Sequence, residues 1–162
     1  MSGYFALDPR PLAPEDRQGA RVLLLGALGV TPYIDRALEV LEEAERSRGD
    51  DAEHRAIVIA RDGTVAGIAI FGIVTGTMGA AKLHIAALAA GVDAEDVGVR
   101  LMESVASAAR DSGARFLLAE VPDDPAVGAI LTLLEEHDFV EEARVPDFYR
   151  DGVALRFLKR RL

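Results

Sequence analysis

Residues 55–74 read RAIVIARDGTVAGIAIFGIV, and this stretch decides the class of fold. Two runs rich in β-branched residues flank an Asp-Gly pair at 62–63, which is typical of a two-residue β-hairpin turn. A third run of this kind, AAKLHIAALA at residues 80–89, follows the turn-like sequence GTMG. Three successive strands with short connections predict an antiparallel meander. Gly67 and Gly72 lie inside its second strand and indicate a β-bulge or a close backbone approach.

Two helices are predicted before this meander. Residues 31–47 repeat apolar side chains at helical spacing, with Thr31 as a capping residue and Pro32 at the first helical position. Upstream, a proline and an acidic first turn predict a shorter helix over residues 13–28. Residues 4–7 are expected to form an edge strand ahead of it.

The second half of the chain alternates helices with strands. The predicted elements are, in order, a helix over 93–113, a buried strand over 115–121, a helix over 125–138, and strands over 139–145 and 153–160, with 146–152 as the loop between the last two. The whole order, β-α-α-β-β-β-α-β-α-β-β, predicts a layered α/β domain. No linker or repeat divides residues 1–162, so we expect one domain.

The composition excludes several classes of function. The chain has 162 residues, a formal charge of −9 and no cysteine, so disulfides, thiolate nucleophiles and cysteine-bound metals are excluded. A nucleic-acid surface needs clustered Lys and Arg, and the one dense basic run is the C-terminal KRRL. No apolar run is long enough to span a bilayer, and no secretory leader is recognisable. We therefore expect a cytoplasmic protein with neither nucleic acid nor membrane as its partner.

The C-terminal sequence carries a family resemblance. Residues 130–162, ILTLLEEHDFVEEARVPDFYRDGVALRFLKRRL, taken with the order of elements, resemble the GNAT superfamily of acyl-CoA-dependent N-acyltransferases. Phe139 matches a phenylalanine that opens a strand in this family, and residues 146–149 match a Pro-Asp-Phe-Tyr loop of one bacterial subgroup. Residues 31–47 resemble that subgroup's early helix, which helps form the acceptor side of the site.

The resemblance covers nearly the whole chain and implies a GNAT-like fold. That fold has a central mixed, mostly antiparallel and splayed sheet of about 6–7 strands flanked by about 4 helices. The resemblance implies acetyl-CoA as the donor, an amine of a small molecule or peptide as the acceptor, and a homodimer as a family-level expectation. Backbone groups of Ala86, Ala87 and Leu88 would pair with the pantetheine arm of the donor.

The family holds the coenzyme A pyrophosphate on a (Gln/Arg)-x-x-Gly-x-(Gly/Ala) turn that opens a helix. On this chain the turn falls on Asp93, Ala94, Glu95, Asp96, Val97 and Gly98. The final glycine matches. Asp93 replaces the Gln or Arg, Asp96 replaces the first glycine, and Glu95 stands where a basic residue is common.

These acidic residues suit the helix better than they suit a diphosphate. A helix N-terminus presents unpaired N–H groups and about half a positive charge. With Asp93 as the N-cap, and Glu95 and Asp96 in the first turn, the chain supplies its own anion there. A carboxylate and a phosphate ~4 Å apart repel by roughly 1 to 4 kcal/mol, depending on the effective dielectric. The turn therefore predicts weakened binding of coenzyme A.

Three other signature positions also differ from the family. Leu134 stands where many members have a tyrosine that resembles a general acid. Asp138 replaces the glycine that usually precedes the phenylalanine matched by Phe139. An asparagine often follows the fifth strand in this family, and on this chain it is replaced around Asp123 and Asp124. Any chemistry on this chain must therefore use other side chains.

Three residues are candidates for that chemistry. Glu120 and His84 lie on strands that would flank the splayed centre, where a general base is needed, and Tyr149 is suited to donate a proton or to line the acceptor pocket. Each has a structural alternative. Glu120 would be a strand-end carboxylate in solvent, His84 a half-buried or surface strand histidine, and Tyr149 a tyrosine packed on the sheet. His54 and His137 lie in polar sequence, and we expect both at the surface, without metal-ligand spacing.

Two functions of different classes follow from this pattern. The first is an acyl-CoA-dependent N-acyltransferase that moves an acetyl or short acyl group to an amine by direct attack. The second is a GNAT-shaped binding or interaction module that has lost the donor. Titration with acetyl-CoA distinguishes the two.

Overall fold

The computed structural model describes residues 8–47 and 53–162. The strands are β1 (Arg10–Pro11), β2 (Arg55–Arg61), β3 (Thr64–Ile73), β4 (Ala80–Leu88), β5 (Phe116–Pro122), β6 (Val140–Arg150) and β7 (Val153–Arg161). The helices are α1 (Arg17–Leu28), α2 (Ile34–Arg46), α3 (Val99–Asp111) and α4 (Gly128–Glu136). Short helical turns precede α1, α3 and α4. The predicted strand at 4–7 lies outside the described residues.

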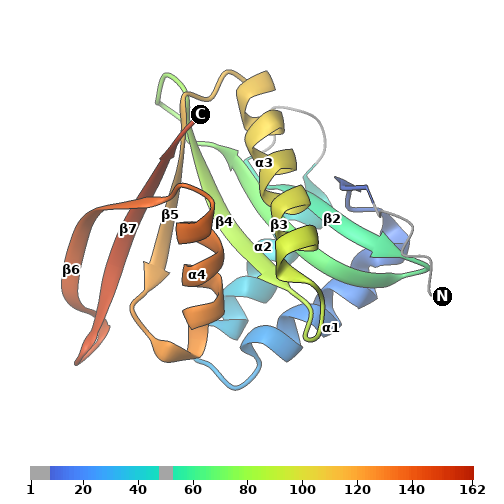
Figure 1. Ribbon diagram of the computed structural model, residues 1–162, viewed down its shortest axis with the longest axis horizontal. Coiled ribbons are helices and arrows are strands. Elements are labelled where there is room, and N and C mark those ends of the chain that lie inside the picture. The colour runs from blue at the N-terminus through green and yellow to red at the C-terminus, as the bar shows by residue number, and fades with distance from the viewer. Residues whose placement is uncertain (1–7, 48–52) are drawn as a thin grey trace.

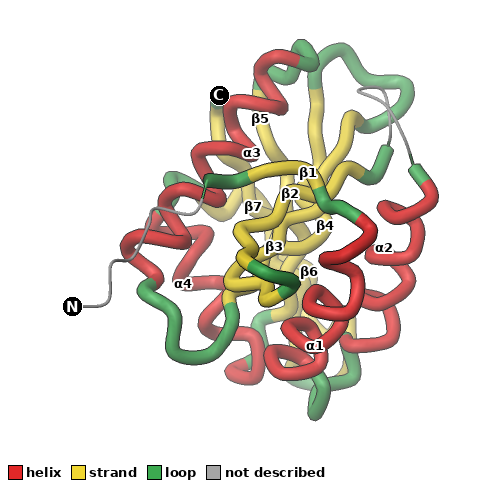
Figure 2. The backbone as a smooth tube through the Cα atoms, turned by 90° about the vertical axis from the view of Figure 1, so that its right-hand side faces the viewer, coloured by secondary structure: helices red, strands yellow, loops and turns green. Residues whose placement is uncertain are grey.

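The strands form one seven-stranded sheet in the order β1-β2-β3-β4-β5-β7-β6. Helices α1 and α2 cover one face and α3 and α4 cover the other, as Figures 1 and 2 show. The core is built on both faces, from fully buried residues such as Leu24, Leu41, Ile68, Leu101 and Val105. The mixed α/β fold expected from the sequence is confirmed. None of the described helices is long and apolar enough to cross a membrane.

The meander of β2, β3 and β4 forms as its sequence predicts. Asp62 and Gly63 have φ values of 50° and 75°, which is the left-handed backbone of a type I′ turn. The β2–β3 register shifts next to Gly67, where β3 contributes one extra residue. At Gly72 a Cβ atom would lie 1.9 Å from the carbonyl oxygen of Glu53, so glycine allows that backbone to approach.

The centre of the sheet opens between β4 and β5. These two parallel strands pair only from Ala80–Lys82 with Phe116–Leu118, although β4 continues to Leu88 and β5 to Pro122. Figure 1 shows the two strands diverging below this point. One edge of β4 therefore faces a gap, as the splayed sheet of the resemblance requires.

Two local predictions were wrong. Helix α2 begins at Ile34 with Tyr33 as its N-cap residue, and the Thr31 hydroxyl bridges the two helices by donating to the Leu28 carbonyl at 2.7 Å and accepting from the Tyr33 N–H at 3.3 Å. Residues 146–149 are not in a loop: β6 continues to Arg150, and the tight turn lies at residues 151–152. The register with β7 shifts after Val145, so these extra residues are accommodated as a bulge inside the hairpin.

Candidate active site

Two cavities meet where β4 and β5 separate. One has a volume of about 360 Å³ and contains Tyr149 in its wall; we call it the Tyr149 cavity. The other, of about 1110 Å³, contains Glu95 in its wall and is called the Glu95 cavity. Both cavities are lined by Ala86, Ala87, Val127 and Ile130. The two cavities thus have a common wall of β4 and the start of α4 beside the gap in the sheet.

The structure brings Glu120, His84 and Tyr149 together in the wall of the Tyr149 cavity. Glu120 lies on β5, and its carboxylate accepts a hydrogen bond from the Lys82 ammonium on β4 at 2.9 Å. This ion pair crosses the gap where strand pairing ends. The Glu120 side chain is 43% exposed, so its carboxylate is within reach of a ligand.

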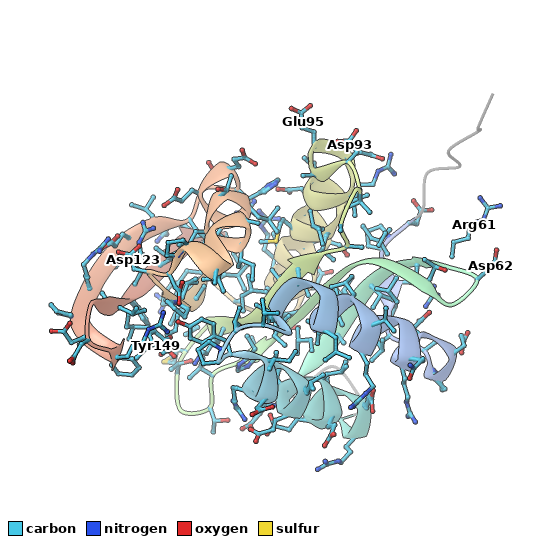
Figure 3. All side chains as sticks on the ribbon, turned by 90° about the horizontal axis from the view of Figure 1, so that it is seen from below. Arg61, Asp62, Asp93, Glu95, Asp123 and Tyr149 are labelled. Carbon is cyan, nitrogen blue, oxygen red and sulfur yellow. The ribbon has the colours of Figure 1, made fainter. Side chains whose placement is uncertain are left out.

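Tyr149 extends from β6, on the side of the molecule where Figure 3 also places Asp123. Its ring contacts that of Tyr33 edge to face, with centroids 5.6 Å apart. Burial raises the pKa of Tyr149 to about 12, with further contributions from Glu120 and Tyr33. The hydroxyl is therefore protonated at neutral pH and is a hydrogen-bond donor.

His84 is the extra residue of a β-bulge. In the β3–β4 register Ile70 faces Ile85 and Phe71 faces Leu83, which leaves His84 unopposed. A bulge re-aims a side chain, and here the side chain lines the Tyr149 cavity. Burial first, and then the nearby His54 and Lys82, lower the pKa of His84 to about 4. The imidazole is therefore neutral at pH 7.

The prediction that His54 lies at the surface was wrong. Its side chain is 16% exposed and stacks on the His84 ring, with centroids 4.5 Å apart. His54 Nε2 lies 3.0 Å from the Glu43 carboxylate of α2. The close approach of the Glu53 backbone to Gly72 positions His54 beside the sheet. Because these segments are distant in sequence, periodicity gives no signal for this pair.

A polar cluster beside the cavity was also missed. The Asp124 carboxylate accepts from the Tyr33 hydroxyl at 2.7 Å, from Arg150 at 2.8 Å and from the backbone N–H of Ala126 at 3.0 Å. The Ala126 N–H, followed by Tyr33, holds the pKa of Asp124 below its usual range. This cluster joins the start of α2, the β5–α4 connection and β6 around the Tyr149 cavity. An Asp before Pro125 is a recognisable N-cap signal, whereas its two side-chain partners are not.

The Glu95 cavity borders the edge of β4 that faces the gap. Ala86, Ala87 and Leu88 line it from this edge. An extended arm with amide groups is suited to pair with such an edge in the manner of a strand. All three side chains are apolar, and Ala86 and Ala87 are small.

The turn before α3 does not fit a diphosphate. The Asp93 carboxylate accepts from the N–H groups of Glu95 at 2.9 Å and Asp96 at 3.3 Å, as the sequence predicts for an N-cap. The N–H of Val97 bonds to the Asp93 carbonyl at 2.8 Å. Figure 3 shows Asp93 and Glu95 together at the end of α3, well away from Tyr149.

Among the described residues, the wall of the Glu95 cavity contains no positive side chain. The charged residues that line the Glu95 cavity are Glu95 and Glu136. Arg100, one turn into α3, donates to Asp96 at 2.6 Å. Gly98 matches the family pattern, and it has a packing reason, since a Cβ there would lie 2.9 Å from the Leu133 side chain. The residues of this turn therefore do not fit a diphosphate, because they present carboxylates where a diphosphate needs positive charge or free N–H groups.

The remaining signature position is apolar. Leu134 is 1% exposed and lines the Tyr149 cavity from α4. Across residues 8–47 and 53–162, no group of three or more His, Asp or Glu side chains is arranged to hold a metal ion.

Comparisons by sequence find no matching protein-family model and no significant match among curated proteins. Solved structures do match. A predicted acetyltransferase of the GNAT family from Desulfovibrio desulfuricans has a TM-score of 0.81 and 24% identity, over 94% of this chain and 97% of the other. Aminoglycoside 6′-acetyltransferase type Ii has a TM-score of 0.77 and 14% identity, over 94% and 96%.

A third structure, yncA from Salmonella typhimurium with its cofactor acetyl-CoA, has a TM-score of 0.72 and 18% identity, over 97% of this chain and 94% of the other. The agreement extends over nearly the whole length of each chain. Together with the splayed sheet and the paired cavities, it shows that this protein has the GNAT acetyltransferase fold.

Proposed function

We propose that the protein is an N-acyltransferase that moves an acetyl or short acyl group from a thioester to an amine. The observation that carries this proposal is the pair of cavities that meet at the gap between β4 and β5. One cavity offers a strand edge to an extended donor arm, and the other contains three polar side chains. Structural neighbours named as acetyltransferases, one of them with acetyl-CoA, support the proposal.

Each polar side chain has a role in this reaction. The Glu120 carboxylate holds the acceptor ammonium and accepts the proton that the amine must lose before it attacks. The protonated Tyr149 hydroxyl donates to the departing sulfur or to the acyl oxygen. The neutral His84 ring, which lines the same cavity, helps to fix the acceptor. A bound thioester supplies the electrophilic carbonyl.

Acetyl-CoA is the natural test donor, although the turn at Asp93 disfavours its diphosphate. The assay should therefore run in parallel with a nucleotide-free thioester, S-acetyl-N-acetylcysteamine. Release of free thiol is read directly, because the chain has no cysteine to contribute a background. Simple amines at millimolar concentration serve as acceptors.

A matched pair of variants distinguishes catalysis from a nonspecific effect. Glu120→Gln removes the proposed base. Glu142→Gln is the control, because Glu142 is also a strand carboxylate paired with a lysine, at 3.1 Å, and is 45% exposed. We expect Glu120→Gln to lower the rate by roughly 10²-fold or more and Glu142→Gln to leave it unchanged. Equal rates in both variants, or no thiol release from either donor, would contradict the proposal.

A further inference from the structure

We propose that the acceptor is a primary monoamine carried on an apolar body, bound in the Tyr149 cavity. This inference rests on the proposed function and names its substrate class. The cavity wall is mainly aliphatic, with contributions from α1, α2, β4 and α4. Its larger apolar residues include Leu28, Val40, Ile85, Val127, Ile130 and Leu134.

Charge in this cavity is sparse and largely compensated. Among the residues in its wall, Glu120 is the carboxylate, and it already shares its charge with Lys82. Arg36 is the cation, and it pairs with Glu39 at 3.1 Å and Glu43 at 3.4 Å. The cavity therefore offers one carboxylate for one ammonium group, and apart from Arg36, His84 and the two tyrosines the rest of a ligand meets apolar side chains.

This arrangement discriminates between classes of amine. A polyamine or an aminoglycoside would bury further ammonium groups against aliphatic side chains, which is costly without a partner for each charge. An amino acid would place a carboxylate beside an arginine that two glutamates already engage. An alkyl or arylalkyl amine avoids both costs, and its body gains from transfer out of water.

The cavity also has a size that suits this class. A volume of about 360 Å³ lies at the small end of the range for ligand pockets. Tyr33 and Tyr149 present ring surface from two different elements, and the Asp124 cluster holds these elements together. The wall is therefore preorganised, so that an apolar body does not have to order it on binding.

The test is a calorimetric titration of the protein with a homologous series of n-alkylamines, without any donor. Each added methylene should tighten binding by roughly three- to fourfold until the cavity is filled. Hexylamine should bind about tenfold or more tightly than 1,6-diaminohexane, because the second ammonium meets no partner. A flat series, or tighter binding of the diamine, would overturn the inference.

Hexanol separates recognition of the ammonium from simple apolar binding. In Glu120→Gln, hexylamine should lose about tenfold in affinity while hexanol changes by less than about twofold. Glu142→Gln should change neither. An equal loss for both ligands, or for both variants, would remove the role of Glu120 in binding amines.

The binding and turnover experiments fail independently. Alkylamine binding with the predicted pattern, but without thiol release from either donor, would contradict the proposed function and leave the amine class standing. Thiol release with a polyamine as the preferred acceptor would uphold the proposed function and overturn the inference.

Discussion

Removing the charge of the acidic turn while keeping its cap should strengthen binding of acetyl-CoA. In the double variant Asp93→Asn, Glu95→Gln, the side-chain oxygen at position 93 still accepts from the backbone of residues 95 and 96, since Asn is as good an N-cap as Asp. The variant therefore keeps the cap and removes two charges, at a cost to the helix of up to about 1 kcal/mol for each charge lost. Asp96 stays in place because Arg100 already compensates its charge.

The magnitude follows from the position of the two carboxylates. A charge ~4 Å from a phosphate repels it by about 1 kcal/mol even at the dielectric of water. Removal of two such charges should lower the dissociation constant by about thirtyfold, which corresponds to about 2 kcal/mol. Salt provides a second signature. The wild-type affinity should rise with ionic strength, because the Debye length falls from about 30 Å at 0.01 M to about 8 Å at 0.15 M.

Calorimetric titration at both ionic strengths measures these effects. The control is Glu142→Gln, Asp151→Asn, which changes the net charge equally in the distant β6–β7 hairpin. Thermal unfolding of each variant verifies that the fold is intact. Micromolar binding by the wild type that weakens with salt would refute the reasoning, and so would an equal gain in the control variant.

Three further perturbations test the surroundings of the site. Asp124→Ala should lower the midpoint of urea unfolding more than Asp124→Asn does, because Asn keeps the cap of the turn before α4. Gly72→Ala should force its Cβ against the Glu53 carbonyl, with a loss of about 1 to 3 kcal/mol in unfolding free energy and altered NMR signals of the stacked histidine rings. His84 titrates near 6.5 when unfolded and at about 4 when folded, so the unfolding free energy should fall by at most about 3 kcal/mol as pH drops through that range. Urea titrations of His84→Gln at a series of pH values should show a smaller fall in unfolding free energy as the pH drops.

The order and type of elements could be predicted because local signals agree with the tertiary structure. The Asp-Gly turn, the strand periodicity of β2 to β4 and the helical period of α3 each depend on residues close in sequence. The N-cap at Asp93 is local as well, and the structure shows it as predicted. The cavity residues Glu120 and His84 were found only because the family resemblance identified the strands that flank the gap.

The sequence could not predict features that depend on contacts between distant segments. The strand conformation of residues 146–149 requires pairing with β7 around a bulge, and local sequence resembles a loop instead. The stacking of His54 on His84 requires the approach of Glu53 to Gly72 across the sheet. The Tyr33 and Arg150 partners of Asp124 come from segments 91 and 26 residues away.

The acidic turn and the Tyr149 cavity act on different steps of the proposed reaction. A repelled diphosphate weakens donor binding equally in the ground state and the transition state, so it raises KM and leaves kcat unchanged. In the proposed reaction Glu120 and Tyr149 would act at the reacting atoms, so their loss should lower kcat. For a nucleotide-free thioester the turn is irrelevant, and its kcat/KM should be unaffected by Asp93→Asn, Glu95→Gln, whereas that of acetyl-CoA should rise. Equal responses of both donors would mean that the turn acts through the fold and not through charge.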